Sequence, residues 1–337
     1  MTEFDYYLSL EHQSAAAAVD SAALAERTGF ETVWAADHFH PWFHTAHDGT
    51  SANAADPWTW LAAAVERTDE VRLGASGTSF LHRHHPADVA QRLATLTELA
   101  TDPERVFLAV GTGTALNEIP LGYPWPRYTE RAKRTAEGIR IVRRLFEESF
   151  VDHDGEFWTL DGANLYAGPD EAPPVTVAAG GPTTARMAGD LGDGFMTVYR
   201  DPERVREELF PALERGVEKS DRNDDPDDVT RLVLLNCSYA TDERAAVEAC
   251  RPLAGSLLPV FFEHGIADPR YIQRHGEKVG DDQIREEFLV ATDADAIIDA
   301  VSTYVDCGFD RVVFHSNSPD EGAFCDVVAD DVIPSFD

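Results

Sequence analysis

The chain has 337 residues, 43% of them hydrophobic, and its 61 Asp and Glu residues against 28 Lys and Arg residues give a formal net charge of −33. A chain of this length and apolar content can bury a full core, as one large barrel or as two smaller domains. Nucleic acids and anionic membranes bind to clustered Lys or Arg, so we expect this acidic chain to bind neither of them. We expect its partner to be a small-molecule substrate. The even spread of acidic residues indicates a protein adapted to high salt, where self-repulsion is screened.

The cysteines and the N-terminus indicate a cytoplasmic protein. The four cysteines form no C-x-x-C pair and no short framework spacing, so we expect neither structural zinc nor a disulfide scaffold. The N-terminus carries Glu3, Asp5 and Glu11 where a secretory signal peptide needs basic residues and an apolar run. We also expect no apolar stretch of membrane-spanning length.

Short apolar runs alternate with longer amphipathic segments along the whole chain, which is typical of alternating strands and helices. The runs that we predict as buried strands are 4–10, 32–36, 71–76, 106–110, 175–179, 194–198, 232–237 and 311–315. The predicted helices are 15–28, 57–67, 86–100, 128–148, 183–191, 202–219, 243–251, 293–306 and 320–333.

Eight strands alternating with helices favour an α/β fold of the (β/α)8 TIM-barrel type over an open, doubly wound sheet. We expect one barrel domain spanning residues 1–337. Two connections are too long for plain barrel loops, and we interpret residues 149–174 and 253–290 as insertions. The first contains Asp154-Gly155, a dipeptide that favours a hairpin turn.

The segment after the second strand contains the best candidates for catalysis. The strand runs into Asp37 and His38 and then turns at Pro41 and Trp42. In a barrel the carboxyl ends of the strands form the site, and histidine is the side-chain type that exchanges a proton near neutral pH. A lone histidine would favour a simple hydrogen bond in a loop, but Glu11 follows the first strand at the same end.

Glycine and small polar residues follow three further strands. Ser76-Gly77 ends the third, the run 111–114 follows the fourth, and Gly180-Gly181 follows the fifth and opens a helix. Glycine lets a backbone approach a ligand, and the amides at a helix N-terminus hold phosphate. Each glycine pair alone favours an ordinary tight turn, because the G-x-G-x-x-G spacing of a dinucleotide site is missing. Together they indicate a phosphate-bearing cofactor.

Seven histidines in two stretches raise the alternative of a metal site. They are His38, His40, His44, His47, His82, His84 and His85. Their spacing matches no common ligand set, and barrel hydrolases usually add a carboxylate from a late strand. We therefore predict no metal site.

Four motifs together indicate a resemblance to a known family. They are ADHFHPW at 36–42, VGTGTALNE at 110–118, VAAGGP at 177–182 and GDGF at 192–195. Through them the chain resembles the luciferase-like superfamily, and within it the branch of dehydrogenases that use coenzyme F420, a deazaflavin, typified by glucose-6-phosphate dehydrogenase. The resemblance spans nearly the whole chain. It implies a TIM barrel with insertions, usually a homodimer, that holds the deazaflavin at the strand ends in preference to FMN.

The resemblance also implies roles for individual residues. His38 falls on the catalytic base, Trp42 on a tryptophan that stabilises the charged intermediate, and Glu11 on a carboxylate beside them. Ser76 and Gly77 fall on a bulge that props the ring, often with a non-prolyl cis peptide. The residues implied in cofactor binding are Asp37, Ser76, Gly77, Ser79, Gly111, Asn117, Ala178, Ala179, Gly180 and Gly181.

The sequence departs from this branch where the substrate is expected. Thr114 replaces a glutamate of the glucose-6-phosphate enzymes, and Glu263 and Glu287 replace a lysine and an arginine that hold the substrate phosphate. We expect Arg200 to preserve one basic contact and Arg270 or Arg274 to add others, and Val198 belongs to the same predicted substrate region. Carboxylates repel a phosphate dianion, so we expect a neutral secondary alcohol, polyol or sugar.

The resemblance and the residues together predict a coenzyme F420-dependent dehydrogenase. In it His38 deprotonates a hydroxyl group while the carbon-bound hydrogen leaves as hydride to the deazaflavin. One alternative is a dehydrogenase that also uses F420 but acts on glucose 6-phosphate or another sugar phosphate. A second is an FMN-dependent luciferase-like monooxygenase, and a third is a deazaflavin carrier without catalytic activity.

Overall fold

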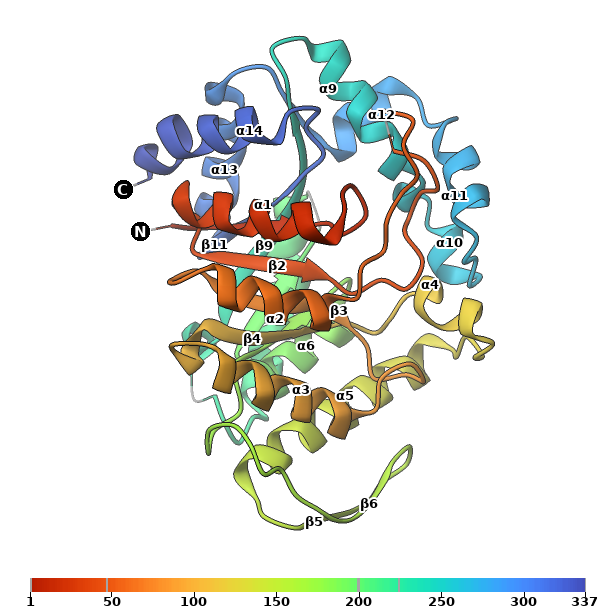
Figure 1. Cartoon of the computed structure of the whole chain (residues 1–337), viewed down its shortest axis with the longest axis vertical. Coiled ribbons are helices and arrows are strands. Elements are labelled where there is room, and N and C mark those ends of the chain that lie inside the picture. The colour runs from red at the N-terminus through yellow and green to blue at the C-terminus, as the bar shows by residue number, and fades with distance from the viewer. Residues whose placement is uncertain (1, 47, 199–200, 224, 337) are drawn as a thin grey trace.

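Eight parallel strands close into a barrel that is surrounded by helices (Figure 1). The computed structural model describes residues 2–46, 48–198, 201–223 and 225–336. The barrel strands are β1 (Glu3–Leu8), β2 (Thr32–Ala36), β3 (Arg72–Thr78), β4 (Val106–Val110), β7 (Val175–Ala178), β8 (Gly194–Thr197), β9 (Thr230–Tyr239) and β11 (Arg311–Ser316). Pairing of β8 with β9 closes the ring. The predicted (β/α)8 barrel is confirmed.

The strands form where the sequence is apolar on both faces. Every residue of β2 and of β4 is buried, as expected for parallel strands that lie between outer helices and an inner core. Five large side chains of the inner core come from β2, β4, β8, β9 and β11. They are Trp34, Phe107, Met196, Leu234 and Val313. The inside of the barrel is therefore packed with side chains.

Two of the outer helices, α1 and α2, begin after residues whose side chains cap free backbone amides. The side chain of Ser14 accepts the amide of Ala17 at 3.3 Å, and that of Asp56 accepts the amide of Thr59 at 2.8 Å. The longer α-helices are α1 (Ala15–Arg27), α2 (Pro57–Arg67), α3 (Pro86–Leu99), α5 (Tyr128–Glu147), α6 (Pro182–Leu191), α8 (Phe210–Val217), α9 (Glu243–Cys250), α11 (Pro269–Gly276), α12 (Asp281–Glu287), α13 (Ala294–Cys307) and α14 (Glu321–Val327).

Two of the predicted helices are interrupted. The sixth consists of α7 (Pro202–Arg204), a π-helical turn at Val205–Leu209 and then α8, and the last passes from α14 into a π-helical turn at Val328–Val332. Pro211 and Pro334 follow these two turns. Proline has no backbone N–H, so the regular hydrogen-bond ladder of an α-helix cannot continue through it.

A ninth parallel strand was not predicted. β10 (Leu289–Ala291) pairs with the end of β9, at Cys237–Tyr239, outside the closed ring. Three residues directly after a helix give no periodicity that distinguishes a strand from a helix end.

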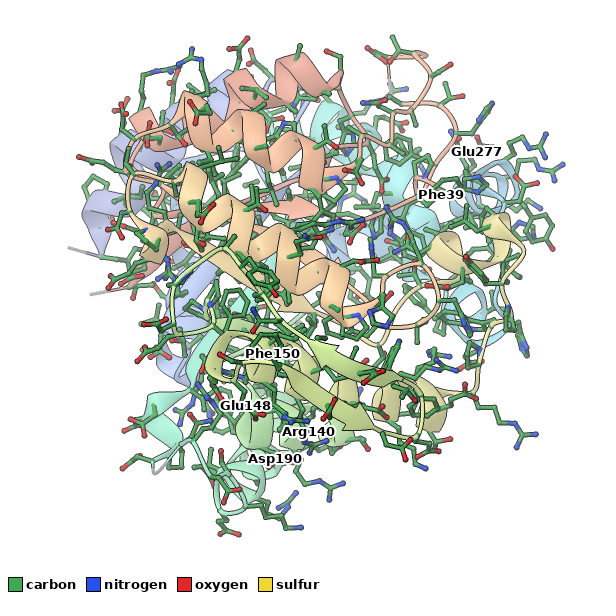
Figure 2. The ribbon with its side chains drawn as sticks, turned by 60° about the horizontal axis from the view of Figure 1, so that its bottom comes forward. Phe39, Arg140, Glu148, Phe150, Asp190 and Glu277 are labelled. Carbon is green, nitrogen blue, oxygen red and sulfur yellow. The ribbon has the colours of Figure 1, made fainter. Side chains whose placement is uncertain are left out.

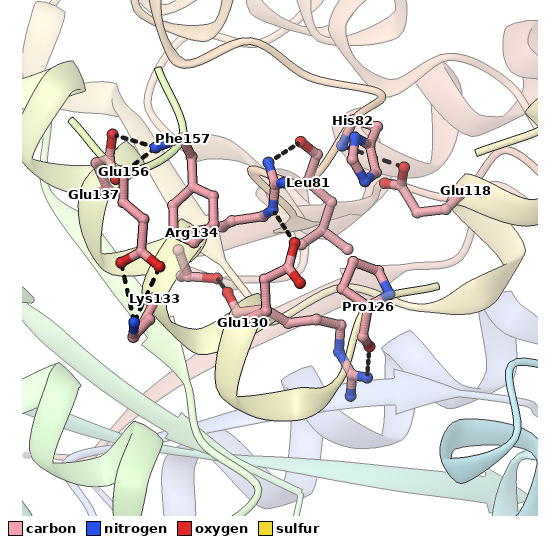
Figure 3. A network of polar contacts seen from close by, with 12 residues as sticks. Leu81, His82, Glu118, Pro126, Glu130, Lys133, Arg134, Glu137, Glu156 and Phe157 are labelled. Atoms are coloured by element: carbon pink, nitrogen blue, oxygen red, sulfur yellow. Dashed lines mark hydrogen bonds and ion pairs between the residues drawn. The ribbon is translucent and has the colours of Figure 1, made fainter. Parts of the chain in front are cut away.

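The hairpin predicted after α5 is present. β5 (Val151–Asp154) pairs with β6 (Thr159–Ala163) in antiparallel register, and Phe150 marks its start in Figure 2. The turn is held against α5 because Oε1 of Glu137 accepts the amide of Phe157 at 3.2 Å (Figure 3).

The second long connection is helical. It contains a 3-10 helix, η5 (Arg251–Leu257), then α10 (Val260–Glu263), α11 and α12. Contrary to our expectation, one stretch, Glu243–Glu263, is long and apolar enough by length and composition alone to cross a membrane. Half of it is buried within the fold, and core helices of globular proteins meet the same criterion. The division of the chain into one barrel domain with two insertions stays a prediction.

Candidate active site

The three residues predicted as catalytic meet where β1 and β2 end. These strands are neighbours, with Leu8 opposite Ala35, so the chain leaves both at the same rim. Nδ1 of His38 lies 2.5 Å from Oε1 of Glu11. Oε2 of Glu11 accepts the backbone N–H of Trp42 at 2.9 Å. The ring centroids of His38 and Trp42 are 6.1 Å apart, and the rings are nearly perpendicular, at 86°. One carboxylate therefore contacts both the imidazole of His38 and the backbone of Trp42.

The surroundings of His38 suit a general base. Glu11 is only 2% exposed, whereas the side chain of His38 keeps 15% of its surface accessible. A carboxylate oxygen beside Nδ1 favours the tautomer with its hydrogen on Nδ1, which leaves the lone pair of Nε2 to accept a proton. Once Nε2 is protonated, the same carboxylate stabilises the imidazolium charge.

Asp37 is completely buried behind this pair. Its carboxylate accepts hydrogen bonds from Thr78 Oγ1 at 2.8 Å and from Arg83 Nη1 at 2.6 Å, and Nε2 of His84 lies 3.0 Å away. Burial opposes ionisation, but the hydrogen bonds and charges of His84 and Arg83 outweigh it and hold the pKa of Asp37 below its ordinary value. The side chain thus anchors the end of β2 to the segment after β3, and the predicted contact of Asp37 with a cofactor stays a prediction.

Asn117 ties α4 (Ala115–Glu118) to the same loop. Its Oδ1 accepts the amide of Phe39 at 2.8 Å, and its Nδ2 donates to the carbonyl of Asp37 at 2.8 Å. The side chain is buried, with 1% of its surface exposed. Asn117, which was predicted to contact a cofactor, therefore bonds the backbone on each side of His38.

The predicted bulge at Ser76 and Gly77 is present, but the cis peptide expected there is not. The pairing of β3 with β4 shifts register between Ala75 and Thr78. All peptide bonds between the described residues are trans, and Gly77 adopts a φ of 80°. Glycine reaches this left-handed conformation without steric cost, so the backbone turns here through Gly77 itself.

A cleft of about 330 Å³ lies beside the N-terminus of α6. It is lined by Thr112, Tyr128, Ala178, Gly180, Gly181, Pro182, Thr183, Thr184 and Arg204. Gly181 is the N-cap of α6 and provides no side-chain cap. The first amides of the helix and the partial positive charge of its dipole therefore favour an anion in this cleft.

The other predicted cofactor residues lie next to the bulge or at the end of β7. The amide of Gly111 donates to the carbonyl of Thr78 at 3.0 Å, and the amide of Ala179 donates to Met196 at 2.7 Å. Oγ of Ser79 is buried and has no hydrogen-bond partner in the described structure. Their contact with a cofactor stays a prediction.

The predicted substrate residues belong to separate elements and do not form a cluster like that of Glu11, His38 and Trp42. Thr114 precedes α4, and its Oγ1 is buried without a hydrogen-bond partner among the described residues. Val198 follows β8 and is 56% exposed. Glu263 and Glu287 end α10 and α12 and are exposed. Arg200 lies outside the residues that the structure describes.

Two histidines of the stretches considered as a metal site contact protein groups instead. Nδ1 of His40 lies 2.9 Å from the carbonyl of Ala267, and His84 is paired with Asp37. His47 lies outside the described residues. Within those residues, the structure contains no group of three or more His, Cys, Asp or Glu side chains arranged to hold a metal ion.

His315, near the end of β11, was not among the predicted site residues. Its Nδ1 lies 2.7 Å from Oδ1 of Asn236, and its ring lies 5.0 Å from the ring of Tyr7. Burial, with smaller contributions from the charges of His12 and His38, lowers the pKa of His315 to about 3. Because β11 is a barrel strand, the rule that polar residues at strand ends build the site would have found it.

Relatives of known family share this fold. The model of the luciferase-like monooxygenase family matches residues 2–311. The chain is 38% identical over 322 residues to the F420-dependent glucose-6-phosphate dehydrogenase of Intrasporangium calvum, which covers 94% of each chain. It is 36% identical over 332 residues to the enzyme of the same name from Mycolicibacterium gilvum, with 98% of this chain and 96% of that one covered.

Two solved structures extend the comparison. An F420-dependent secondary alcohol dehydrogenase in complex with an F420-acetone adduct has a TM-score of 0.93 and 35% identity, covering 100% of this chain and 99% of that one. A coenzyme F420-dependent tetrahydromethanopterin reductase from Methanopyrus kandleri has a TM-score of 0.82 at 22% identity over the same shares of the chains, which shows a common fold. The chain therefore belongs to the luciferase-like monooxygenase family.

Proposed function

We propose that this protein is a coenzyme F420-dependent dehydrogenase that interconverts a secondary alcohol, or a C–OH group of a sugar, and its carbonyl. The observation that carries the proposal is the arrangement of Glu11, His38 and Trp42 at the barrel rim, with a carboxylate 2.5 Å from Nδ1 of the histidine. The names of the relatives, which are F420-dependent dehydrogenases of glucose 6-phosphate and of secondary alcohols, support the same chemistry.

The residues at the strand ends fit such a cofactor. A Cβ added at Gly77, Gly180 or Gly181 would meet no heavy atom within 4 Å, so the backbone is open to a ligand there. Ser79 and Thr114 each have a buried hydroxyl oxygen without a partner among the described residues. In the proposed complex the bulge at Gly77 supports the ring, and the cleft at Gly180 and Gly181 holds the phosphate.

The chemistry then divides between the cofactor and the protein. F420 supplies a hydride acceptor. Nε2 of His38 takes the proton of the substrate hydroxyl while the hydrogen on the same carbon leaves with its electron pair, so that a carbonyl remains. Glu11 stabilises the imidazolium that forms, and the indole of Trp42 offers its ring to the developing positive charge.

We propose a neutral substrate. Exposed Glu263 and Glu287 occupy the positions that the family resemblance gives to substrate phosphate, and carboxylates repel a dianion. Arg270, which is close in sequence to Glu263, is engaged by both oxygens of Asp268, at 3.0 and 2.9 Å. The secondary alcohol dehydrogenase among the solved structures supports an uncharged alcohol.

The test is a binding and turnover screen of the purified protein in molar salt. We expect F420 to bind in the micromolar range and FMN and NADP to remain unbound. Alcohols, polyols and sugars, each with and without phosphate, are then offered while the absorbance of F420 is followed. Efficient oxidation of glucose 6-phosphate would support the sugar-phosphate alternative, preferential FMN binding would support a monooxygenase, and F420 binding without any turnover would indicate a carrier.

Three further properties belong to this proposal. The family resemblance supports a homodimer, the formal net charge of −33 supports a requirement for high salt, and the sequence composition supports a cytoplasmic location. Sedimentation of the protein in molar and in low salt tests the first two. A monomer at micromolar concentration in molar salt would exclude the dimer.

A further inference from the structure

The loop that contains His38 and Trp42 lies against α11, far away along the chain. In Figure 1 the loop after β2 extends to the side of α11 and α12, and Figure 2 labels Phe39 of this loop and Glu277 at the end of α11. Contacts between His44 and Gln273, 229 positions apart, confirm this neighbourhood. The loop therefore depends on the second long connection for its position.

Gln273 makes the closest of these contacts with both ends of its carboxamide. Its Oε1 accepts the backbone amide of His44 at 2.8 Å and that of Thr45 at 2.9 Å. Its Nε2 donates to the carbonyl of Thr45 at 3.0 Å. Only a side chain with both a carbonyl oxygen and an N–H group can make all three bonds.

The support on which Gln273 sits is closely packed. Its neighbour Ile272 is fully buried, and a Cβ added at Gly276 would meet the backbone nitrogen of Gly255 at 2.4 Å. α11 therefore lies directly on the backbone of η5. Because α11 is packed in this way, it provides a rigid support, and the carboxamide of Gln273 restricts the position of the loop.

We call the three hydrogen bonds between Gln273 and the backbone of His44 and Thr45 the clamp. Trp42 is the candidate active-site residue next to it. It precedes His44 by two positions, its ring lies 5.0 Å from that of Phe262 in α10, and its amide reaches Oε2 of Glu11. A shift of the backbone at His44 would move Trp42 relative to Glu11. It would thereby disturb the carboxylate that also orients His38.

We infer that Gln273 is a positioning residue for the proposed reaction, which acts by clamping the backbone of His44 and Thr45 and so fixes Trp42 against Glu11 and His38. The inference rests on the proposed function for its catalytic consequence. The clamp itself is a property of the folded chain and is measured without a cofactor.

Hydrogen exchange tests the clamp. In Gln273→Leu, the amides of His44 and Thr45 lose their acceptor, so we expect them to exchange about tenfold faster, with no change in the barrel strands. Gln283→Leu is the matched control, because Gln283 is an exposed glutamine in α12 of the same connection. Unchanged exchange at His44 and Thr45 would overturn the clamp.

A double-mutant cycle tests the catalytic role. We expect Gln273→Leu to lower kcat about tenfold and to leave the affinity for F420 unchanged, because the geometry around Trp42 is disturbed and the cofactor cleft is not. In a Trp42→Leu background, Gln273→Leu should have no further effect on kcat. Gln273→Glu retains the two acceptor bonds and should restore part of the rate.

The outcomes separate the two proposals. If Gln273→Leu lowers kcat equally with and without Trp42, the residue does not act through Trp42 and the inference is wrong. If the parent protein shows no F420-linked turnover, the proposed function is wrong, while the exchange rates of His44 and Thr45 still decide whether the clamp exists.

Discussion

Asn117 holds the backbone on both sides of His38, accepting from the amide that follows it and donating to the carbonyl that precedes it, each at 2.8 Å. The imidazole therefore projects from a short stretch of chain whose two flanking peptides are fixed by one buried carboxamide. This bracketing fixes the backbone of His38 independently of the hydrogen bond between its ring and Glu11.

Replacing Asn117 by leucine should lower both turnover and stability. The amide of Phe39 and the carbonyl of Asp37 would lose their partner, at a cost of about 1–3 kcal/mol each, and a displaced base should reduce kcat about a hundredfold. Thermal unfolding and steady-state kinetics measure the two effects.

Asn164→Leu is the control for this change. Asn164 also accepts one backbone amide, at 3.1 Å, and donates to one carbonyl, at 2.8 Å, but it lies in the β5–β6 segment. It should lower the melting temperature and leave kcat intact. If Asn117→Leu also left kcat intact, the bracket would have no catalytic role.

Removal of the imidazole should separate catalysis from binding. In His38→Ala we expect turnover to fall about a hundredfold or more because no general base remains, while the affinity for F420, measured by fluorescence titration, stays nearly constant. His44→Ala is the matched control, since His44 is exposed in the same loop and meets Gln273 through its backbone. A normal rate in His38→Ala would remove this residue from the mechanism.

His315 should make the stability of the protein depend on pH. Burial holds its pKa at about 3 in the folded state, against an ordinary value of 6.5. Between these values the unfolded chain binds a proton that the folded chain does not. The contribution of His315 to stability is therefore complete above pH 6.5 and is lost as the pH falls toward 3, with a slope of up to about 1.4 kcal/mol per pH unit.

Chemical unfolding of the parent and of His315→Gln at a series of pH values measures this dependence. Glutamine does not titrate, so the variant should lose less stability than the parent as the pH is lowered through this window. Parallel curves for the two proteins would show that His315 titrates in the folded state as it does in the unfolded chain.

The bulge at Gly77 should be sensitive to a single methyl group. Gly77→Ala places alanine at a φ of 80°, which costs roughly 1–2 kcal/mol, and points the methyl group into open space where the cofactor ring is proposed to lie. We expect a lower melting temperature and weaker F420 binding. Gly280→Ala is the control, because its Cβ also meets no atom within 4 Å but its φ is an ordinary −71°.

Much of the barrel could be predicted from local pattern. The bounds of β2, β4 and α2 agree with the predicted segments, because each is an apolar run or amphipathic stretch between clear caps and turns. The π-helical turns before Pro211 and the three-residue β10 depend on hydrogen bonding and long-range pairing, which periodicity does not record.

The sequence predicted which residues of the candidate site lie together, but not all of their contacts, and their catalytic roles stay a prediction. Glu11, His38 and Trp42 come together as the strand-end rule and the family resemblance indicated. The engagement of Asp37 by Arg83 and His84 could not be read from the chain, because it depends on how the segment after β3 folds back. The backbone at Gly77 is trans, unlike the cis bond that often accompanies the bulge in the family resemblance, and Gly77 has a φ of 80°.

The residues that hold the loop after β2 come from distant parts of the chain, and this affects how the enzyme folds. Glu11, Asn117 and Gln273 belong to the beginning, the middle and the last third of the chain, so ordering this loop requires contacts of high sequence separation, which form slowly. During refolding, helical signal should return before enzymatic competence. An incomplete nascent chain emerging from the ribosome would contain His38 long before it contained Gln273, which holds the backbone of the same loop.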